Sequence, residues 1–533
     1  MSNDGVSSVS EWWQGAVIYQ IYPRSFCDSN GDGVGDLNGI TSKLDYVASL
    51  GVDGIWVSPF FKSPMHDFGY DVADFRDVDP VFGTLEDFDR LLAKAHSLGL
   101  KVVIDQVYSH ASMDCEWFQE SKKDKNGDKA DWFVWADAKP DGSPPNNWQS
   151  VFAGPAWTWS AARKQYYLHN FLSEQPDLNL HNPAVQEELL SVARFWLDRG
   201  VDGFRLDATN FYMHDPELRD NPPYKNGNAV RPFDMQDQIY NQSHPDIEKF
   251  LTRLRTLIDD YGAKFTVAEV GGRRSLEEMA AYTKGNQLLH TAYSFIFLEE
   301  EELTVPGIRG AIEDWDQAAD SWPSWTFSNH DRKRVVSRWK RSRPAEAFAK
   351  AMNALLLSLK GTIFIYQGEE LGLPQADVPY DRLVDPEAIK NWPETLGRDG
   401  CRTPMPWSCE GAGGGWPADT WLPFDAAHFP LAVNAQEDDP ASTLAFTRDL
   451  LTLRKVHPAL VTGEISFIDV PEPVIAFTRT LGDETLLCVF NLGEEEATWA
   501  CPMPPQKFLL GIGGVESAHQ NRLPVCGGFI ASV

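Results

Sequence analysis

Apolar segments of two kinds alternate along most of this chain, and their order predicts its architecture. Short, continuously apolar segments indicate buried strands, and longer segments with regularly spaced apolar residues indicate amphipathic helices. The predicted strands are residues 16–21, 54–58, 102–107, 203–207, 265–269, 292–297, 325–328 and 362–366. The predicted helices are residues 40–50, 85–98, 185–199, 247–261, 276–282, 308–320, 345–359 and 443–457. Eight strands, each followed by a helix, predict a closed parallel barrel.

Two long segments interrupt this alternation. Residues 108–181 follow the third strand, are polar and rich in tryptophan, and contain KKDKNGDKADWF and KPDGSPPNNW. This segment is too long for an ordinary connection between a strand and a helix, so it predicts a small subdomain over the barrel mouth. Residues 397–430, rich in glycine and proline, follow the eighth strand and are expected to overhang the same mouth.

The pattern changes after His457. Short alternating segments such as VIAFTRT and LLCVFNL predict antiparallel strands up to the end of the chain. The predicted fold class is therefore α/β, a (β/α)8 TIM barrel with an inserted subdomain after the third strand and a C-terminal antiparallel β-domain. The barrel takes residues 12–107 and 182–458, the inserted subdomain 108–181, and a β-sandwich-like domain 459–533.

The chain is strongly acidic. Its 533 residues include 47 Lys and Arg against 77 Asp and Glu, which gives a formal net charge of −30. Such a surface repels phosphate backbones and anionic lipids. In addition, no apolar run reaches the ~20 residues of a membrane helix. Neither nucleic acid nor a membrane is therefore an expected partner, and a strongly anionic substrate is disfavoured.

Cysteine usage and the opening residues bear on the location of the protein. The seven cysteines are odd in number and show no C-x-x-C spacing, which favours buried free thiols in a reducing compartment. The opening MSNDGVSSVSEWW has neither the basic nor the apolar segment of a signal peptide. A cytoplasmic location is expected.

The 19 tryptophans suit either stacking on sugar rings or filling a large core.

Three acidic residues stand at or just after the ends of predicted strands. Asp207 ends GFRLD, Glu269 lies in TVAEVGG and Asp331 closes FSNHD. The carboxyl ends of barrel strands meet at one mouth, where barrel enzymes place their chemistry. A single acid there could cap a helix. Three acids from separate strands, with Arg205 and His330 beside two of them, favour a catalytic site.

Paired carboxyl groups suit the cleavage of a glycosidic bond with retention of configuration. That reaction needs one carboxylate as nucleophile and one carboxylic acid as proton donor, ~5–5.5 Å apart. Arg205 lies two residues before Asp207, on the same face of its strand, where it can keep Asp207 ionised. Glu269 must instead stay protonated, and burial together with negative neighbours raises a carboxyl pKa in that direction.

The chain resembles the α-amylase superfamily, glycoside hydrolase family 13, in its oligo-1,6-glucosidase and α-glucosidase branch. DQVYSH (105–110), GFRLD (203–207), AEVGG (268–272) and FSNHD (327–331) are similar to the four main sequence blocks of the family, in order. QPDLN (175–179) is similar to a mark of this branch. The resemblance covers nearly the whole chain. One departure is Ser109, where many relatives carry Asn, and it leaves His110 in place.

The resemblance implies roles for individual residues. Asp207 would be the nucleophile, Glu269 the acid/base and Asp331 the stabiliser of the transition state. The sugar-binding residues that it implies are Asp67, Tyr70, His110, Arg205, His330 and Arg398. Phe152 and Phe171 lie in the matching segments of the insertion and would wall the pocket, although a place in the core would explain them almost as well.

The expected activity is that of an exo-acting α-glucosidase, which releases terminal glucose from a small oligosaccharide or another short α-glucoside. In the family, a Val directly after the nucleophile accompanies a preference for α-1,6 linkages, and a small Ala or Thr accompanies a preference for α-1,4 linkages. Ala208 therefore predicts a preference for α-1,4 substrates such as maltose, unless it merely packs against the barrel wall.

The segment DSNGDGVGD, just after the first predicted strand, is a candidate cation-binding loop. Asp28, Asn30, Asp32 and Asp36 place side-chain oxygens at alternate positions, and Val34 would add its backbone carbonyl. Hard cations such as Ca²⁺ or Mg²⁺ prefer such ligands, although loops of Asp, Asn and Gly are often simple turns. Together with the family resemblance, the loop predicts a structural Ca²⁺ or Mg²⁺ site.

Other functions stay open at this point. A glucosyltransferase or glucoside isomerase of the same fold, of the trehalose or isomaltulose synthase type, would share every catalytic residue. A non-catalytic binding module would be expected to lack the carboxylates, and a metal-dependent hydrolase would need clustered His ligands at strand ends, so the sequence disfavours both. The sequence specifies neither the oligomeric state nor the natural sugar.

Overall fold

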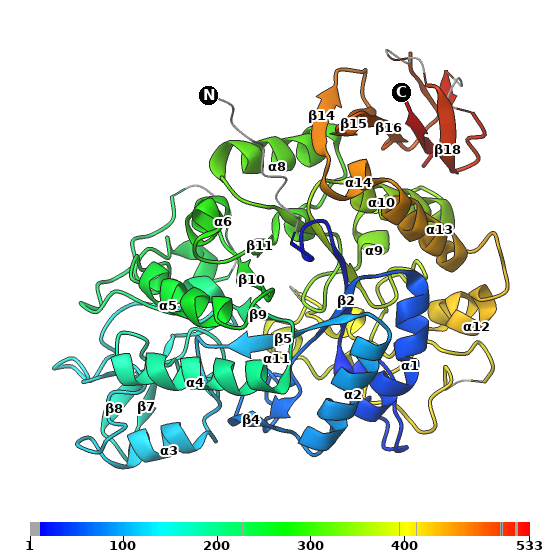
Figure 1. Cartoon of the computed structure of the whole chain (residues 1–533). Helices are drawn as coiled ribbons and strands as arrows, with labels where there is room; N and C mark the ends of the chain where they lie inside the picture. Colours follow the sequence, from blue (N-terminus) through cyan, green and yellow to red (C-terminus); the bar gives the residue numbers. More distant parts are fainter. Residues whose placement is uncertain are drawn as a thin grey trace.

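A closed barrel of parallel strands forms the centre of the molecule (Figure 1). The computed structural model describes residues 11–225, 229, 231–393, 395–411, 413–500, 503, 505–517 and 521–533. The barrel strands are β1 (Val17–Ile21), β2 (Gly54–Val57), β5 (Lys101–Val107), β9 (Gly203–Asp207), β10 (Phe265–Val270), β11 (Thr291–Ser294), β12 (Ser324–Thr326) and β13 (Thr362–Tyr366). Their order around the barrel, β1-β13-β12-β11-β10-β9-β5-β2, follows the order along the chain. The predicted (β/α)8 barrel is confirmed.

One or more helices follow each barrel strand. The longer ones are α1 (Leu37–Leu50), α2 (Leu85–Ser97), α4 (Pro183–Arg199), α5 (Ile247–Asp259), α6 (Ser275–Thr283), α8 (Val305–Ala318), α10 (Ala345–Ser358) and α13 (Thr443–Val456). Shorter ones are α3 (Glu116–Lys123), α7 (Ile296–Glu299), α9 (Val335–Trp339), α11 (Pro386–Asn391), α12 (Val433–Gln436) and α14 (Pro458–Thr462). Asp36 accepts the N–H of Gly39 and so caps α1. This cap explains why α1 begins at Leu37 rather than at the predicted residue 40.

Two predicted strands extend two or three residues beyond the strands in the structure. The strand predicted over residues 292–297 ends at Ser294, and α7 follows it. Phe297 and Leu298 are buried on that helix, and a short apolar run does not distinguish a buried helix turn from a strand. The strand predicted over residues 325–328 is β12, which ends at Thr326. Beyond it the Thr326 hydroxyl donates to the carbonyl of Ser328, and the chain turns away.

Smaller sheets are attached to the barrel. After β2 comes a hairpin of β3 (Phe61–Lys62) and β4 (Asp74–Val78). After β5 come α3 and an antiparallel sheet of β6 (Trp135–Ala136), β8 (Gln165–Leu168) and β7 (Trp157–Ser160). These last elements lie within the predicted insertion, at the end of the molecule opposite the C-terminal sheet in Figure 1.

The chain ends in an antiparallel domain, drawn in orange and red in Figure 1. Its main sheet has the order β14 (Glu464–Ile468), β15 (Val474–Leu481), β16 (Glu484–Asn491), β20 (Gly528–Ser532) and β18 (Lys507–Ile512). The pair β17 (Ala497–Thr498) and β19 (Arg522–Leu523) packs on this sheet through a shared apolar cluster. The predicted C-terminal antiparallel domain is confirmed.

Strand alternation decides which side chains enter the barrel. In β9, Phe204 and Leu206 belong to the main apolar core, whereas Arg205 and Asp207 face the opposite way. A separate apolar cluster that includes Ile18, Val103 and Phe364 fills the barrel below them. Charged groups therefore occur toward the carboxyl ends of the strands, above an apolar layer.

Two further findings bear on the expectations about location. Within the part of the chain that the structure describes, no helix combines the length and the apolar character needed to cross a membrane. The six cysteines in that part are free thiols. Cys501 and residues 1–10, on which the signal-peptide prediction rests, lie outside the described residues.

Candidate active site

A cavity of about 530 Å³ opens at the carboxyl ends of the barrel strands. All three predicted catalytic carboxyl groups line it: Asp207, Glu269 and Asp331. So do six of the predicted sugar-binding residues, namely Asp67, Tyr70, His110, Phe152, Phe171 and Arg398. Arg205 and His330, the other two, are fully buried behind this lining. The fold therefore brings the predicted site together from segments that are far apart in the sequence.

One guanidinium group joins the two central carboxyl groups. Nη1 of Arg205 lies 2.6 Å from Oδ1 of Asp207, and its Nη2 lies 2.6 Å from Oε1 of Glu269. Asp105, on the neighbouring strand β5, is also 2.6 Å from Nη1 and accepts the indole N–H of Trp56. Asp207 and Glu269, from adjacent strands β9 and β10, thus flank a single buried cation.

Burial is the largest influence on these carboxyl groups. It raises the pKa of Asp105 to about 6, of Asp207 to about 7 and of Glu269 to about 8, each against the lowering effect of Arg205. A single cation does not compensate three ionised carboxylates, and Asp207 raises the pKa of Glu269 further. Of the two central groups, Glu269 therefore keeps its proton to the higher pH and Asp207 ionises first.

Asp331 lies in the opposite electrostatic setting. Its Oδ1 is 2.7 Å from Nη2 of Arg402 and 3.6 Å from Nη1 of Arg398, and its Oδ2 is 3.1 Å from Nε2 of His330. Burial acts to raise its pKa, but these neighbours together hold the pKa of Asp331 well below its usual range. Asp331 is a permanent negative charge on the cavity wall.

Arg398 is held by two carboxylates. Its Nη2 lies 2.8 Å from Oδ1 of Asp67 and 2.7 Å from Oδ1 of Asp385, and its backbone N–H and Nε also donate to Asp385. Asp67 accepts a further hydrogen bond, at 3.1 Å, from the side-chain amide of Gln175, the first residue of QPDLN. Charged donors and acceptors fixed in this way are suited to binding the hydroxyl groups of a sugar.

The His330 ring is fixed from both sides. The side-chain N–H of Gln20 donates to Nδ1 of His330 at 2.7 Å, and Nε2 lies 2.6 Å from the hydroxyl of Tyr70. Because Nδ1 accepts, the proton of His330 is on Nε2, and burial lowers the pKa of this ring to about 3. Tyr70 can accept this proton in a hydrogen bond and direct its own hydroxyl hydrogen to a ligand.

His110 and two phenylalanines form another part of the wall. The hydroxyl of Ser109 lies 2.8 Å from Nδ1 of His110, so the residue that departs from the family pattern supports the ring. Phe171 packs against His110 with ring centroids 5.0 Å apart, and the Arg398 guanidinium lies 5.0 Å from the centroid of Phe152. Since both phenylalanines also line the cavity, they contribute an apolar wall.

The residue after Asp207 connects the two central carboxyl groups through the backbone. Ala208 has φ 43° and ψ 48°, a left-handed conformation that is uncommon for a residue other than glycine. In this conformation its N–H donates to Oε2 of Glu269 at 2.9 Å, and Ala208 lines the cavity. The turn that ends β9 therefore supports Glu269 and leaves only a methyl group facing the ligand space.

The sequence analysis missed much of the cavity lining. The missed residues include Asn210, Phe211, Arg231, Phe233, Asp234, Gln238 and Gln242 from the segment after β9, Arg273, Phe295 and Arg332 from other loops, and Glu299 and Glu387 from the short helices α7 and α11. Most lie in irregular segments whose sequences show no periodicity, so no pattern indicated that they reach the cavity. Asp385 was also missed. Gln175 could have been predicted from the sequence, because it is the first residue of the QPDLN motif.

The predicted cation-binding loop lies outside the cavity, and none of its five predicted ligands lines it. Asp28 accepts the backbone N–H groups of Asn30, Gly31 and Gly33, and Asp32 accepts that of Val34. The carboxylates of the three aspartates do not all lie within 4.8 Å of one another. The donor set is nevertheless all oxygen, which fits a hard cation.

The same loop packs against the segment after β13. The backbone N–H of Trp421 donates to the carbonyl of Gly33 at 3.1 Å. A Cβ atom at Gly33, whose φ is +84°, would lie 2.0 Å from the carbonyl oxygen of Asp419. Trp421 in turn lies 4.8 Å from the Arg24 guanidinium. The loop is thus a support for the predicted overhanging segment, residues 397–430.

Comparison with known proteins agrees with this geometry. Residues 20–463 match the family model described as "Alpha amylase, catalytic domain". The chain is 52% identical to a "Probable alpha-glucosidase" of Rhizobium meliloti (strain 1021), over 99% of both chains. It is 37% identical to an "Oligo-1,6-glucosidase" of Heyndrickxia coagulans, over 94% of this chain and 96% of that protein.

A solved structure is similar over its whole length as well. The crystal structure of the alpha-glucosyl transfer enzyme XgtA superposes with a TM-score of 0.95 at 49% identity, over 98% of this chain and 99% of that one. The family model and relatives of this identity and coverage, on a barrel with these carboxyl groups, establish the family. The chain belongs to the α-amylase family, glycoside hydrolase family 13, in the branch of the oligo-1,6-glucosidases and α-glucosidases.

Proposed function

We propose that this chain is a retaining, exo-acting α-glucosidase that releases terminal glucose from short α-glucosides, with a preference for α-1,4 linkages such as that of maltose. The observation that carries the proposal is the Arg205 guanidinium in contact with both Asp207 and Glu269. Two carboxyl groups that share one guanidinium are close neighbours. This supports retention, which needs a separation of ~5–5.5 Å, rather than the wider spacing of inverting enzymes.

In this mechanism Asp207 attacks the anomeric carbon while the glycosidic bond breaks. The electron pair of that bond goes to the leaving oxygen, which takes the proton of Glu269, and a glucosyl ester of Asp207 forms. Glu269, now a carboxylate, takes a proton from the water that attacks the ester. Glucose leaves with its configuration retained, and both carboxyl groups return to their starting states.

The electrostatics of the site support these roles. The pKa of Glu269, raised to about 8, lies above that of Asp207, about 7, so the form with Glu269 protonated and Asp207 ionised is favoured over the reverse. Asp331, with its pKa held well below the usual range, offers a fixed negative charge to the positively charged, oxocarbenium-like transition state.

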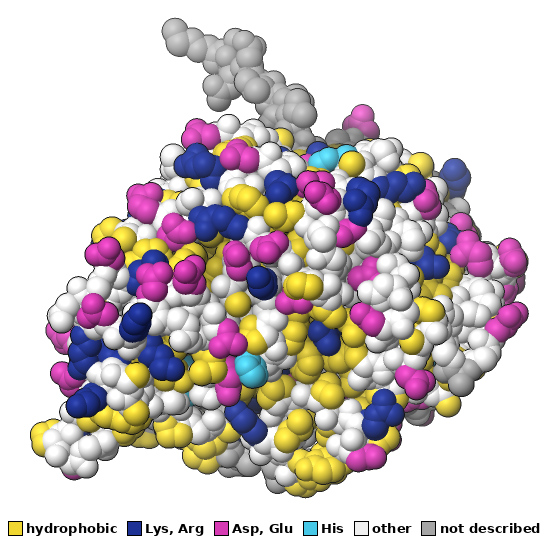
Figure 2. All heavy atoms as spheres, turned by 90° about the horizontal axis from the view of Figure 1, so that it is seen from below, with side chains coloured by type: hydrophobic (Ala, Val, Ile, Leu, Met, Phe, Trp, Pro, Cys, Tyr) yellow, Lys and Arg dark blue, Asp and Glu magenta, His cyan; other side chains and the backbone are white. Residues whose placement is uncertain are grey.

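The rest of the cavity supports a small neutral substrate. The ion pair of Arg398 with Asp67, together with the rings of Phe152 and Phe171, would enclose one terminal glucose. The cations Arg231 and Arg332 are each paired with carboxylates, and Arg273 on the same wall donates to the backbone carbonyls of Asp234 and Gln236. Figure 2 shows the same mixture on one face of the molecule, where basic side chains lie among acidic ones.

The proposal is tested by following products with proton NMR. An aryl α-glucoside, which releases a single glucose, should yield α-glucose first, and β-glucose should appear only through later mutarotation. A panel of maltose, isomaltose, sucrose, trehalose and starch should give glucose as the released product, with maltose preferred over isomaltose and starch poor. Initial release of β-glucose from the aryl α-glucoside would contradict retention, and release of longer oligosaccharides from starch would contradict exo action.

Glucosyl transfer is a second candidate activity. Its support is the similarity to a solved alpha-glucosyl transfer enzyme, and the lining of the cavity by Phe211, Phe233 and Phe295, whose apolar rings can hold an acceptor in place of water. The glucosyl ester is the same in both reactions. Excess acceptor should therefore divert glucose into a new glucoside if transfer competes. Unchanged yields of free glucose would limit the enzyme to hydrolysis.

We further propose that DSNGDGVGD binds Ca²⁺ or Mg²⁺ through Asp28, Asn30, Asp32, the carbonyl of Val34 and Asp36. The all-oxygen donor set supports this. Because the loop packs against Asp419 and Trp421 rather than lining the cavity, the ion would stabilise the fold and take no part in the reaction.

The free thiols of the described cysteines support a reducing, cytoplasmic location, which cell fractionation tests.

A further inference from the structure

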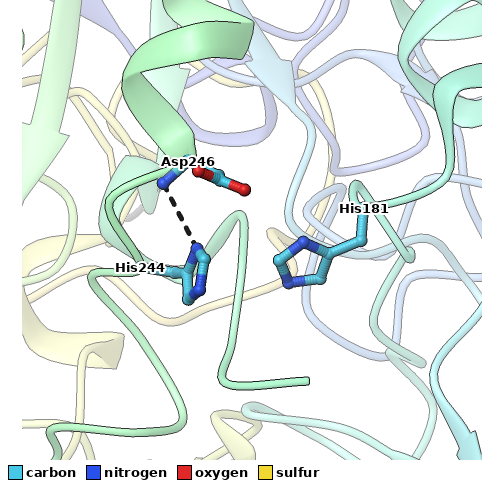
Figure 3. A group of neighbouring side chains, drawn as sticks. All are labelled: His181, His244 and Asp246. Atoms are coloured by element: carbon cyan, nitrogen blue, oxygen red, sulfur yellow. Dashed lines mark hydrogen bonds between the residues drawn. The ribbon is translucent and has the colours of Figure 1, made fainter. Parts of the chain in front are cut away.

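A second cluster of ligand-type side chains lies away from the cavity. His181, His244 and Asp246 each offer one ligand atom, and these atoms all lie within 4.8 Å of one another, the one such group among the described residues. Figure 3 shows the two imidazole rings next to each other, with the carboxylate of Asp246 above the space between them. None of the three residues lines the cavity.

The hydrogen bonds of the two rings decide which nitrogen of each is free to bind a ligand. Nε2 of His181 lies 2.7 Å from the backbone carbonyl of His214, an acceptor only, so this nitrogen carries a proton and in the neutral ring the lone pair is on Nδ1. Nδ1 of His244 accepts the backbone N–H of Asp246 at 3.2 Å, so it also lacks a proton. Each ring therefore has an Nδ1 lone pair, one of them engaged only in a long hydrogen bond.

The bond from His181 to the backbone is informative in itself. Imidazole rings that bind metal ions almost always donate their other N–H to a carbonyl or carboxylate, which fixes the tautomer and the ring orientation. The carbonyl of His214 does this for His181. The orientation expected of a metal ligand is thus already present.

Asp246 behaves unlike the other aspartates at helix starts. It occupies the N-cap position of α5, but its side chain caps none of the backbone N–H groups of the first turn. Asp36 and Asp385, at the same position of α1 and α11, both cap their helices. The side chain of Asp246 instead contacts Lys249 at 2.6 Å, and that lysine side chain is 76% exposed. The carboxylate is therefore available to a ligand on the side of the two rings.

We propose that His181, His244 and Asp246 bind a divalent transition-metal ion of the Zn²⁺ type. Two imidazole nitrogens and one carboxylate form a ligand set that Zn²⁺ binds well, with water in the remaining position. A metal ion would replace the 3.2 Å hydrogen bond to Nδ1 of His244. The nitrogen ligands separate this site chemically from the all-oxygen loop, which suits Ca²⁺ or Mg²⁺.

The position of the cluster indicates what a bound ion does. His181 directly precedes the N-cap residue of α4, whereas His244 and Asp246 lead into α5. The long segment between β9 and α5 carries Gln238 and Gln242, which line the cavity. A metal ion ties the end of this segment to the start of α4. It stabilises one wall of the cavity and leaves the reacting groups untouched.

The experiment uses the full chain in a Cys409→Ser background, because Cys409 is an exposed thiol and thiolates are themselves Zn²⁺ ligands. Protein stripped with EDTA and dialysed is titrated with ZnCl₂ by calorimetry, and its melting curve is recorded with and without Zn²⁺. Co²⁺ is used in parallel, because its visible absorption reports the coordination geometry of the bound ion. We expect one tight Zn²⁺ per chain and a higher melting temperature with the metal.

Variants locate the site. His181→Gln and His244→Gln are expected to weaken Zn²⁺ binding by about tenfold or more and to abolish the rise in melting temperature. His96→Gln is the matched control, since His96 pairs with a single carboxylate, Asp202, at 2.7 Å. It should bind Zn²⁺ like the parent, as should Asp32→Ala in the other loop.

Two results would overturn the proposal. One is a stripped parent that takes up no tightly bound Zn²⁺, and the other is unchanged binding in both histidine variants. If a histidine variant fails to fold, Asp246→Asn supplies the same test, because it retains both rings and removes only the anionic ligand. Its melting curve without metal serves as the control for folding.

Discussion

Replacing Glu269 by glutamine removes the proposed proton donor while keeping the size of the side chain. In the parent, Oε2 accepts the N–H of Ala208 at 2.9 Å and Oε1 lies 2.6 Å from Nη2 of Arg205. An amide can accept only one of these donors, because its NH₂ group must face the other. The variant therefore loses the transferable proton and one of these two contacts, and its melting curve is the control for folding.

The structure gives the expected size and pH dependence of the effect. Removing a general acid costs ~10²–10⁴-fold in rate, or about 3–5 kcal/mol of activation free energy at ~1.36 kcal/mol per tenfold. In the parent, kcat/KM rises with pH as Asp207 ionises, near its pKa of about 7. It falls as Glu269 loses its proton, near its pKa of about 8. Because the two groups interact, each limb of the pH profile reports the titration of the pair rather than of one residue. Glu269→Gln should abolish the descending limb.

The assay compares two substrates that differ in their need for protonation. Maltose has a poor leaving group and should show the full loss, whereas an activated aryl α-glucoside needs little protonation and should lose no more than about tenfold in its first step. Glu299→Gln is the matched control, because Glu299 lines the same cavity but pairs with Arg332 at 2.7 Å. Equal losses on both substrates, or a descending limb that persists in Glu269→Gln, would refute the assignment.

Four other substitutions test separate parts of the site. Asp207→Asn should fold normally and lose several orders of magnitude in turnover, and turnover within about tenfold of the parent would contradict its role as nucleophile. Ala208→Val should shift the kcat/KM ratio from maltose toward isomaltose by ~1–3 kcal/mol. A β-branched residue at φ 43° is also strained, so its melting temperature is measured alongside, and an unchanged ratio would exclude Ala208 as the cause of linkage preference. Asp32→Ala, or EDTA, should lower the melting temperature by removing the cation, and unchanged melting in both cases would make the loop a simple turn. Asp385→Asn weakens the anchoring of Arg398 and should raise KM for maltose by ~10-fold or more, whereas a fall in kcat at unchanged KM would argue against this positioning role.

Local patterns in the sequence were sufficient to predict the barrel and the positions of its central carboxyl groups. Strand and helix periodicities are local properties, so the eight strand–helix units could be read directly. A parallel barrel brings the carboxyl ends of its strands together, which placed Asp207, Glu269 and Asp331 at one mouth before any contact was known. Local patterns failed at residues 295–297, because a short apolar run fits a buried helix turn as well as a strand.

The contacts that set the chemistry depended on the tertiary structure. Nothing in the sequence shows that Asp105 and Glu269 share the guanidinium of Arg205, or that Asp385 anchors Arg398. These contacts join separate segments of the chain, and no local sequence pattern relates one segment to another. The pKa values likewise follow from burial, which only the packed structure defines. His181 and His244 illustrate the same limit. They lie more than sixty residues apart in the sequence, and only the packing of the start of α4 beside the start of α5 brings their rings to 4.9 Å between centroids.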